Sequence, residues 1–315
     1  MSGNYRSDSE VHHIPVMVPQ VIDGLQVKPS CVYVDCTVGE GGHTNAILAS
    51  CDAVRVLGID PDAAALQIAR DRLESHHDRI VLVQDWYTRI TEIASGEGFS
   101  PADGVLLDLG VSSLQLNTAS RGFSFSKPGP LDMRFDPNGD ITAADLVNST
   151  KVDELADIIY KYGEERRSRR IANAIASARP ITKTDQLATV IARSVGRTKG
   201  RKAIHPATRT FQALRIAVND ELGNVADGLD QAIEILKPGG RLVVISYHSL
   251  EDRLVKQAFR AAASDCICSP ETPVCACEHK PKVRIVNKRV IKPSQEEVMT
   301  NPRSRSAKIR IVERV

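Results

Sequence analysis

Short apolar runs alternate with helix-like patterns through the first third of the chain. Four runs have the length and composition of buried strands, and each ends in or beside Gly or Asp. They are Val32–Val38, Arg55–Asp60, Ile80–Gln84 and Gly104–Gly110. The segments Thr44–Ser50 and Asp62–Ser75 between them have helical spacing, and Asp60-Pro61-Asp62 gives the second a capped start. This alternation predicts a doubly wound α/β fold, whose parallel sheet binds its ligand at the carboxyl ends of the strands.

The alternation stops after Leu116. Residues 117–140 are rich in Gly, Pro, Ser and Asp, which is typical of a long structured loop, and residues 141–203 show only helical patterns. We therefore expect an inserted, mainly helical substrate-recognition domain at residues 116–205. The α/β domain is then discontinuous and consists of residues 1–115 and 206–315.

The α/β pattern returns after the predicted insertion. One helix is expected over residues 206–232, and residues 237–240 (Lys-Pro-Gly-Gly) are typical of a helix stop and a tight turn. A strand at Arg241–Tyr247 should follow. Val283–Val286 and Ala307–Val312 are two further strand candidates, which would complete a sheet of about seven strands.

The composition is that of a folded protein outside the membrane. Of 315 residues, 42% are hydrophobic and 25% are charged, and no apolar run approaches the roughly 20 residues that span a bilayer. The polar start of the chain lacks the apolar stretch of a secretory signal. The seven cysteines are an odd number and do not form a secreted disulfide framework, so we expect a cytoplasmic protein.

Positive charge is concentrated in two segments, although the net charge is only +2. Residues 163–202 and 279–315 each contain 11 Lys and Arg against 3 Asp and Glu. Each segment therefore carries +8, which indicates surfaces for a polyanion such as nucleic acid, although solvated basic helices and tails are the alternative. The candidate RNA-binding side chains are Arg166, Arg167, Arg169, Arg170, Arg201, Lys202, Arg303 and Arg305.

A glycine-rich loop directly after the first predicted strand is the strongest local motif. It runs from Asp35 to His43, and its glycines allow the backbone to approach a ligand at the start of a helix. The loop does not match a dinucleotide fingerprint, because Thr44 occupies the position of the last glycine, and no Gly-Lys-Ser/Thr of a phosphate-binding loop follows. An acidic residue followed by glycines is typical of methyltransferases that use S-adenosylmethionine, and this interpretation is favoured over a simple tight turn.

Two strand ends offer further contacts for that cofactor. Asp60 closes the second strand and is placed to accept hydrogen bonds from both ribose hydroxyls. Asp85, Trp86 and Tyr87 close the third, where an aromatic ring can cover an adenine. Core packing is the alternative role of Tyr87.

The fourth strand ends in Asp108, where a parallel sheet keeps its reactive groups. Methyl transfer is an in-line displacement that depends mainly on positioning. If the acceptor is a conjugated amine, a group such as Asp108 must accept its N–H proton. Ser112 can assist this step or simply close the turn.

The chain resembles the ribosomal RNA small subunit methyltransferase H family, also called MraW, over nearly its whole length. The resemblance rests on several motifs in the same order, in addition to the glycine loop and Asp108–Ser113. They are His13-x-Pro15-Val16-Met17, Arg121–Phe125, Gly129–Arg134, Tyr162–Glu165, His205–Arg215, Ser246–Arg253 and Asn301–Lys308. The resemblance implies a Rossmann-like class I S-adenosylmethionine-dependent methyltransferase sheet with an inserted helical domain.

The resemblance also implies the reaction and the site. The expected activity is N4-methylation of a cytidine in the decoding region of 16S ribosomal RNA, within the small ribosomal subunit, by a monomer or homodimer. Asp132 is a further catalytic candidate beside Asp108 and Ser112, while Glu164 and His248 are polar residues that can approach the base or serve the structure. The implied cofactor contacts are Gly41, Gly42, His43, Asp60, Tyr87, Asp108 and Gln115.

Four cysteines near the end of the chain form a separate candidate site. Cys266, Cys268, Cys275 and Cys277 offer enough soft ligands for a tetrahedral, structural zinc ion. Their Cys-x-Cys spacing differs from the more common Cys-x-x-Cys, and reduced thiols or a redox pair are the alternatives.

Three rival functions remain open at this point. A methyltransferase acting on another RNA or a protein would share the fold and cofactor. A non-enzymatic ribosome-assembly factor would share the basic surfaces but would not need Asp60 and Asp108. A dehydrogenase is disfavoured by Thr44 in the glycine loop.

Overall fold

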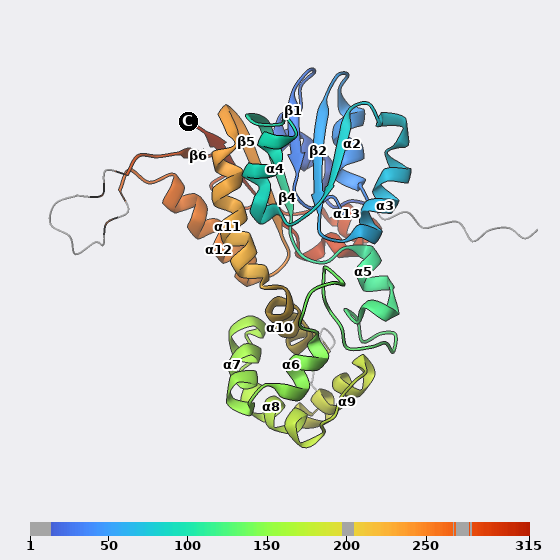
Figure 1. The fold of residues 1–315 in the computed structure, drawn as a ribbon. Coiled ribbons are helices and arrows are strands. Elements are labelled where there is room, and N and C mark those ends of the chain that lie inside the picture. Colours follow the sequence, from blue (N-terminus) through green and yellow to red (C-terminus); the bar gives the residue numbers. More distant parts are fainter. Residues whose placement is uncertain (1–13, 197–204, 267, 269–276, 278) are drawn as a thin grey trace, which may run out of the picture.

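A seven-stranded sheet forms the centre of the computed structural model, which describes residues 14–196, 205–266, 268, 277 and 279–315 (Figure 1). The strand order is β3-β2-β1-β4-β5-β7-β6. Strands β1 to β5 run parallel, whereas β7 lies antiparallel to both β5 and β6. The strands are β1 (Val32–Asp35), β2 (Arg55–Asp60), β3 (Ile80–Gln84), β4 (Ala102–Asp108), β5 (Leu236–Ser246), β6 (Val283–Ile285) and β7 (Lys308–Arg314). The predicted α/β class and the seven strands are confirmed.

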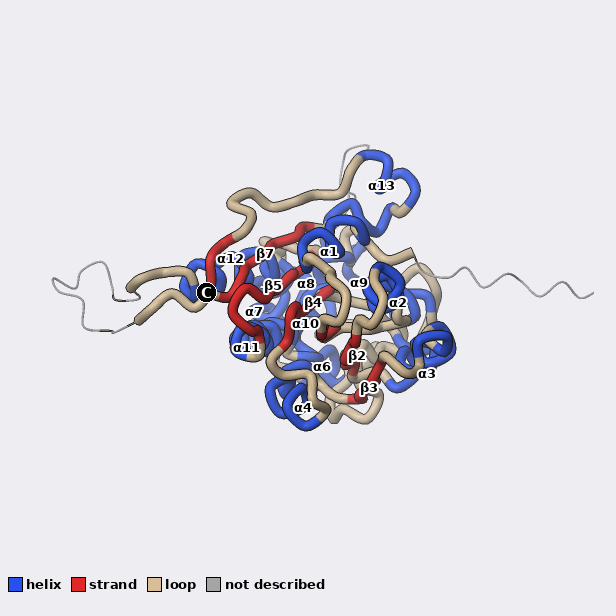
Figure 2. Tube along the Cα trace, turned by 90° about the horizontal axis from the view of Figure 1, so that it is seen from above, coloured by secondary structure: helices blue, strands red, loops and turns tan. Residues whose placement is uncertain are grey.

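Helices cover both faces of the sheet, as the end-on view in Figure 2 shows. Because alternate strand residues point to opposite faces, Val34, Leu57 and Leu107 join one core, while Tyr33, Val56 and Leu106 join the other. The first core contains α4 (Ile90–Gly96), α11 (Glu221–Glu234) and α12 (Ser249–Ala262), and the second contains α1 (Val18–Leu25), α2 (Gly42–Ser50) and α3 (Ala63–Arg72). Among the described residues, no helix has the length and apolar character needed to cross a membrane.

A separate group of helices packs below the sheet in the view of Figure 1. Its core combines apolar faces at helical spacing, such as Leu155 and Ile159, with Phe123 and Leu131 from the long loop that precedes it. The helices are α6 (Ala143–Ser149), α7 (Val152–Gly163), α8 (Ser168–Ser177), α9 (Thr184–Val195) and α10 (Thr208–Asn219). Short helices α5 (Ser113–Asn117) and α13 (Gln295–Thr300) lie outside this group.

The single helix predicted over residues 206–232 is wrong, because the chain forms two helices there. Asp220 has a left-handed backbone (φ 44°) between α10 and α11. The neighbouring Asn219 holds the long loop, since its Nδ2 donates to the Met133 carbonyl at 2.8 Å and its Oδ1 accepts from the Phe135 amide at 2.7 Å. The break therefore lets α10 pack with the lower helices while α11 packs on the sheet.

The turn predicted at residues 237–240 lies within β5 rather than before it, and Gly239 has a left-handed backbone there (φ 79°). The helix stop is confirmed, since α11 ends at Glu234, but the following residues already belong to β5. Leu236 pairs with Ala102 and Arg241 pairs with Gly104, so the intervening residues form a bulge opposite Asp103.

A substitution at Gly58 in β2 tests how tightly side chains pack against the sheet. A Cβ at this position would lie 2.5 Å from a Val38 methyl and 2.7 Å from a Leu82 methyl. We expect Gly58→Ala to lower the free energy of unfolding by about 1–3 kcal/mol through overpacking, measured by urea denaturation.

Gly96→Ala is the matched control, because a Cβ there meets nothing within 4 Å. It should leave stability unchanged or raise it by up to about 1 kcal/mol. Equal losses in the two variants would contradict this account of the packing.

Candidate active site

A cavity of about 570 Å³ lies between the carboxyl ends of the parallel strands and the lower helices. Asp60, Asp108 and Tyr247 line it from the sheet, and Phe211 and Arg215 line it from α10. Its volume is within the roughly 300–1,000 Å³ typical of small-molecule sites. The cavity therefore occupies the position that the strand pattern predicts.

The glycine loop turns sharply between β1 and α2 beside this cavity. Gly39 and Gly41 have left-handed backbones, with φ values of 53° and 79°. Asp35 fixes the loop from below, because its buried carboxylate accepts from the Thr44 hydroxyl at 2.7 Å and the Thr37 amide at 3.1 Å. Thr44, which breaks the dinucleotide fingerprint, thus has a structural role of its own.

Asp60 joins the glycine loop to the start of α3. Its Oδ2 accepts from the Gly39 amide at 2.8 Å, and its Oδ1 accepts from the Asp62 amide at 2.9 Å. Burial raises the pKa of Asp60 to about 7, and these two hydrogen bonds only partly oppose that rise. Each oxygen keeps a second lone pair for a donor inside the cavity.

Asp108 lies between two side chains from different elements. The Tyr247 hydroxyl donates to its Oδ1 at 2.8 Å, and His43 Nδ1 lies 3.5 Å from its Oδ2. His43 Nε2 donates to the Val16 carbonyl at 2.8 Å, since a carbonyl only accepts, so Nδ1 of the neutral ring carries the lone pair.

Burial raises the pKa of Asp108 to about 6. His43 and the hydrogen bond from Tyr247 lower it, whereas the negative charges of Asp35 and Glu251 add to the rise. Asp108 therefore titrates close to neutral pH.

A capping box at the start of α5 closes another side of the cavity. The Ser112 hydroxyl accepts from the Gln115 amide, and the Gln115 side chain accepts from the Ser112 amide. Gln115 also donates to Asp62 Oδ2 at 3.1 Å. The buried Ser113 hydroxyl lines the cavity and has no hydrogen-bond partner among the described residues.

Aromatic side chains are concentrated in this cavity. The chain has one tryptophan, six tyrosines and six phenylalanines. Of these, the cavity lining contains Trp86, Tyr87, Phe123, Phe125, Phe135, Phe211 and Tyr247. Tyr87 also belongs to the sheet core and packs so closely on Gly228 of α11 that a Cβ there would lie 2.4 Å from its ring.

A network of polar residues also lines the cavity, and only one of them, His248, was a candidate from the sequence. Arg215 forms a bidentate pair with Glu221, with N···O distances of 2.7 and 2.9 Å. Glu251 accepts from the Tyr247 amide at 2.8 Å, and His248 Nε2 lies 3.0 Å from its Oε1. Arg215, Tyr247, His248 and Glu251 fall within two motifs of the resemblance, which was the available signal, whereas Glu221 lies outside both motifs.

The structure does not bring every predicted site residue to the cavity. Gly41 packs against Ala69 and Leu73, and Asp132 forms an ion pair with Arg134 at 2.7 Å. Neither residue lines the cavity, whereas Gly42, His43, Asp60, Tyr87, Asp108, Ser112 and Gln115 do.

The predicted RNA-binding arginines fall into two groups. Arg303 and Arg305 line the cavity. Arg166, Arg167, Arg169 and Arg170 are exposed at the start of α8, among the lower helices and outside the cavity lining. Arg201, Lys202 and Cys275 lie outside the described residues.

The strand order and the glycine loop after β1 define the class: a Rossmann-like fold of S-adenosylmethionine-dependent methyltransferases. More narrowly, the chain belongs to the MraW methylase family, whose sequence model matches residues 10–315.

Two relatives of similar sequence agree with this assignment. The chain is 53% identical to a protein of Dehalococcoides mccartyi named ribosomal RNA small subunit methyltransferase H, over 97% of this chain and 87% of that protein. It is 50% identical to a protein of the same name from Thermomicrobium roseum, over 96% and 94% of the two chains. A crystal structure of an rRNA methylase from Streptococcus thermophilus aligns with a TM-score of 0.45 and 11% identity, covering 96% of this chain and 99% of that one.

The ion pair between Arg121 and Asp62 holds the loop after α5 against α3. Arg121 Nη1 lies 2.6 Å from Asp62 Oδ2, and the Asp62 side chain is only 1% exposed. We expect Arg121→Leu to lower the free energy of unfolding by about 3–5 kcal/mol, because it leaves a buried carboxylate without its cation. Chemical denaturation measures this loss.

Arg89→Leu serves as the matched control. Arg89 pairs with Asp85 and Glu92, but its side chain is 53% exposed. Arg89→Leu should lower stability far less than Arg121→Leu does, because solvent screens an exposed ion pair. If the two variants lose similar stability, the Arg121 pair does not hold the loop as described.

Proposed function

We propose that this chain transfers the methyl group of S-adenosylmethionine to the exocyclic N4 of a cytidine in the decoding region of 16S ribosomal RNA. The proposed substrate is the small ribosomal subunit. Membership of the MraW methylase family and relatives named ribosomal RNA small subunit methyltransferase H support the ribosomal RNA substrate. The side chains in the cavity support N4 as the atom that is methylated.

The residues of the cavity suit the proposed cofactor. The Asp60 carboxylate faces the cavity with lone pairs for two ribose hydroxyls, and Tyr87 presents an aromatic ring for the adenine. The left-handed Gly39 and the amides at the start of α2 leave room for the amino-acid end, and the unpartnered Ser113 hydroxyl offers one more hydrogen bond. When bound, S-adenosylmethionine supplies a methyl group on a positively charged sulfur.

The position of the Asp108 carboxylate in the cavity is the observation that carries the proposal. The N4 lone pair of cytosine is conjugated with the ring, so attack on a methyl group requires loss of an N–H proton as the N–C bond forms. Asp108 lines the cavity at the end of β4, where the Tyr247 hydroxyl donates to its Oδ1 and His43 Nδ1 lies 3.5 Å from its Oδ2. In the proposed step the sulfur–carbon bond breaks, the N–C bond forms, and the N4 proton passes to Asp108.

Ser112 and Asp132 have supporting roles in this proposal. Ser112 positions the wall of the cavity by capping α5, and Asp132 orients the long loop through its pair with Arg134. Neither residue accepts the proton in the proposed step.

The surfaces around the cavity suit RNA. Arg303 and Arg305 stand at its edge, and the arginines of α8 add positive charge on the lower helices. Trp86, Phe123 and Phe135 pack together, with ring centroids 6.3 and 5.6 Å apart, and offer an apolar wall to a base turned out of its stack. Phosphate contacts would then position the RNA while the cavity receives the cytosine.

The reaction is tested on small ribosomal subunits that lack the modification, with naked 16S RNA in parallel. We expect labelled methyl transfer to subunits, and nucleoside digestion with mass spectrometry should identify N4-methylcytidine. Asp108→Ala should abolish the product, because the proton acceptor is lost. Asp153→Ala, on the first turn of α7, is the control and should keep full activity.

A different labelled nucleoside would contradict the proposed target atom. The absence of any labelled nucleoside, despite cofactor binding measured by calorimetry, would contradict the RNA substrate.

The pKa of Asp108 gives a second prediction. The ionised carboxylate is the form that accepts the proton, so the rate of methyl transfer should rise with pH through about 6 and then level off. Well below that pKa, the rate should fall about tenfold for each pH unit. Single-turnover rates at saturating S-adenosylmethionine measure this step, because saturation removes the effect of Asp60 titration on cofactor affinity.

Tyr247→Phe should shift the midpoint upward, since the Tyr247 hydroxyl stabilises the Asp108 carboxylate. A rate that stays constant well below pH 6 would rule out Asp108 as the proton acceptor.

A further inference from the structure

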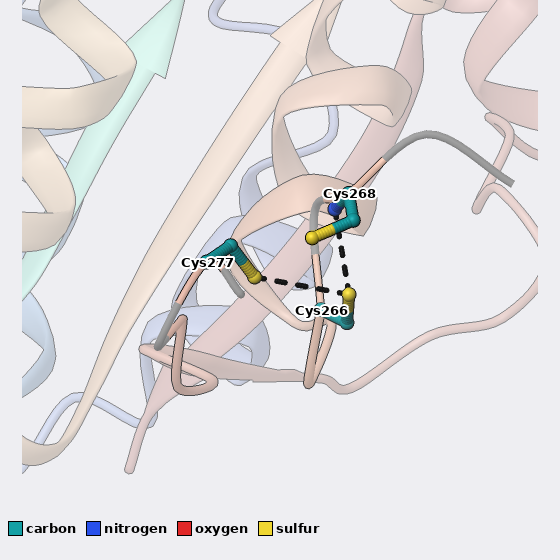
Figure 3. Close-up of side chains that lie close together, drawn as sticks. All are labelled: Cys266, Cys268 and Cys277. Carbon is teal, nitrogen blue, oxygen red and sulfur yellow. Dashed lines mark hydrogen bonds between the residues drawn. The ribbon is translucent and has the colours of Figure 1, made fainter. Parts of the chain in front are cut away.

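Three cysteines converge at the connection between α12 and β6, away from the residues that line the cavity (Figure 3). Cys266 and Cys268 follow α12, and Cys277 precedes β6, so the cluster joins the two ends of one loop. Figure 3 shows the side chains directed toward one another. The three sulfur atoms all lie within 4.8 Å of each other.

We propose that Cys266, Cys268 and Cys277 bind a structural zinc ion. The distance between the sulfur atoms of Cys266 and Cys277 is 3.7 Å. A disulfide would bring two sulfurs to about 2.05 Å. Two thiolates on a tetrahedral zinc ion, each about 2.3 Å from the metal, lie about 3.8 Å apart. The observed separation therefore matches the edge of a zinc–thiolate tetrahedron.

The backbone around Cys266 supports a thiolate at this position. The Cys268 amide donates to the sulfur of Cys266 at 3.4 Å, which stabilises negative charge on that sulfur. Ser264 fixes the same turn, since its hydroxyl donates to the Cys266 carbonyl at 2.6 Å. The Cys-x-Cys segment thus holds two sulfurs on one side of the turn.

The connection needs a stabilising element other than apolar packing. None of its described residues, 264–266, 268, 277 and 279–282, is buried. Its ends meet where the Lys282 amide donates to the Ala262 carbonyl at 2.8 Å, and His279 Nε2 lies 3.1 Å from the Ala261 carbonyl. A bound metal would cross-link the two arms of the loop beyond this point.

The chemistry of the donors favours zinc over other cations. Thiolates are soft ligands, and tetrahedral sulfur sites in proteins hold zinc or iron. The proposed methyl transfer requires no redox step, so the role is structural. Tetrahedral zinc takes four donors, and the proposal rests on the three described thiols.

Elemental analysis of the full chain, purified under reducing conditions without chelator, tests the site. We expect one equivalent of zinc per chain, and Cys266→Ser with Cys268→Ser should remove it. Cys51→Ser is the matched control and should retain the zinc, because Cys51 lies at the end of α2. Chelation should lower the melting temperature of the wild-type protein and of the Cys51→Ser variant.

Cobalt substitution of the wild-type protein keeps the test independent of how the variants fold. Cobalt held by thiolates in a tetrahedron gives intense visible absorption, which zinc should displace. Protein that contains no zinc and shows no such absorption with cobalt would overturn the proposal. An equivalent of iron in place of zinc would overturn the assignment of the metal.

Discussion

The close placement of three carboxylates at one edge of the parallel sheet, one of them buried and two half-buried, is the constraint on which this site depends. Asp35, Asp60 and Asp108 end neighbouring strands, and a buried carboxylate is costly unless donors surround it. The donors come from the glycine loop, the start of α3, α2 and the residue after β5. Satisfying these charges therefore fixes the loops that shape the cavity.

The break between α10 and α11 joins this edge to the lower helices. Asp220 reverses the backbone, and Asn219 bonds the loop that carries Phe135. Arg215, about one helical turn before the break, and Glu221, directly after it, form an ion pair in the cavity lining. One short segment thus sets the position of the aromatic wall relative to Asp108.

The sequence predicted those parts of the fold that depend on local periodicity. The limits of β2 and β3 matched, because each is a short apolar run closed by polar residues. Asp60 and Asp108 were predictable as cavity residues, since parallel strands present their carboxyl ends together. The helix break at Asp220 was not, because tertiary hydrogen bonds of Asn219 override a continuous helical pattern.

Contacts between side chains that are distant along the chain could not be predicted from the sequence either. Nothing near Asp108 indicates Tyr247, and the low overall aromatic content conceals how many rings meet in one cavity. The contact between Tyr87 and Gly228 also limits how the family can diverge. While position 87 carries a ring, position 228 admits no side chain, so these two sites should change together or remain as they are. Among related sequences, such a pair would appear as coupled substitutions at two positions that lie far apart along the chain.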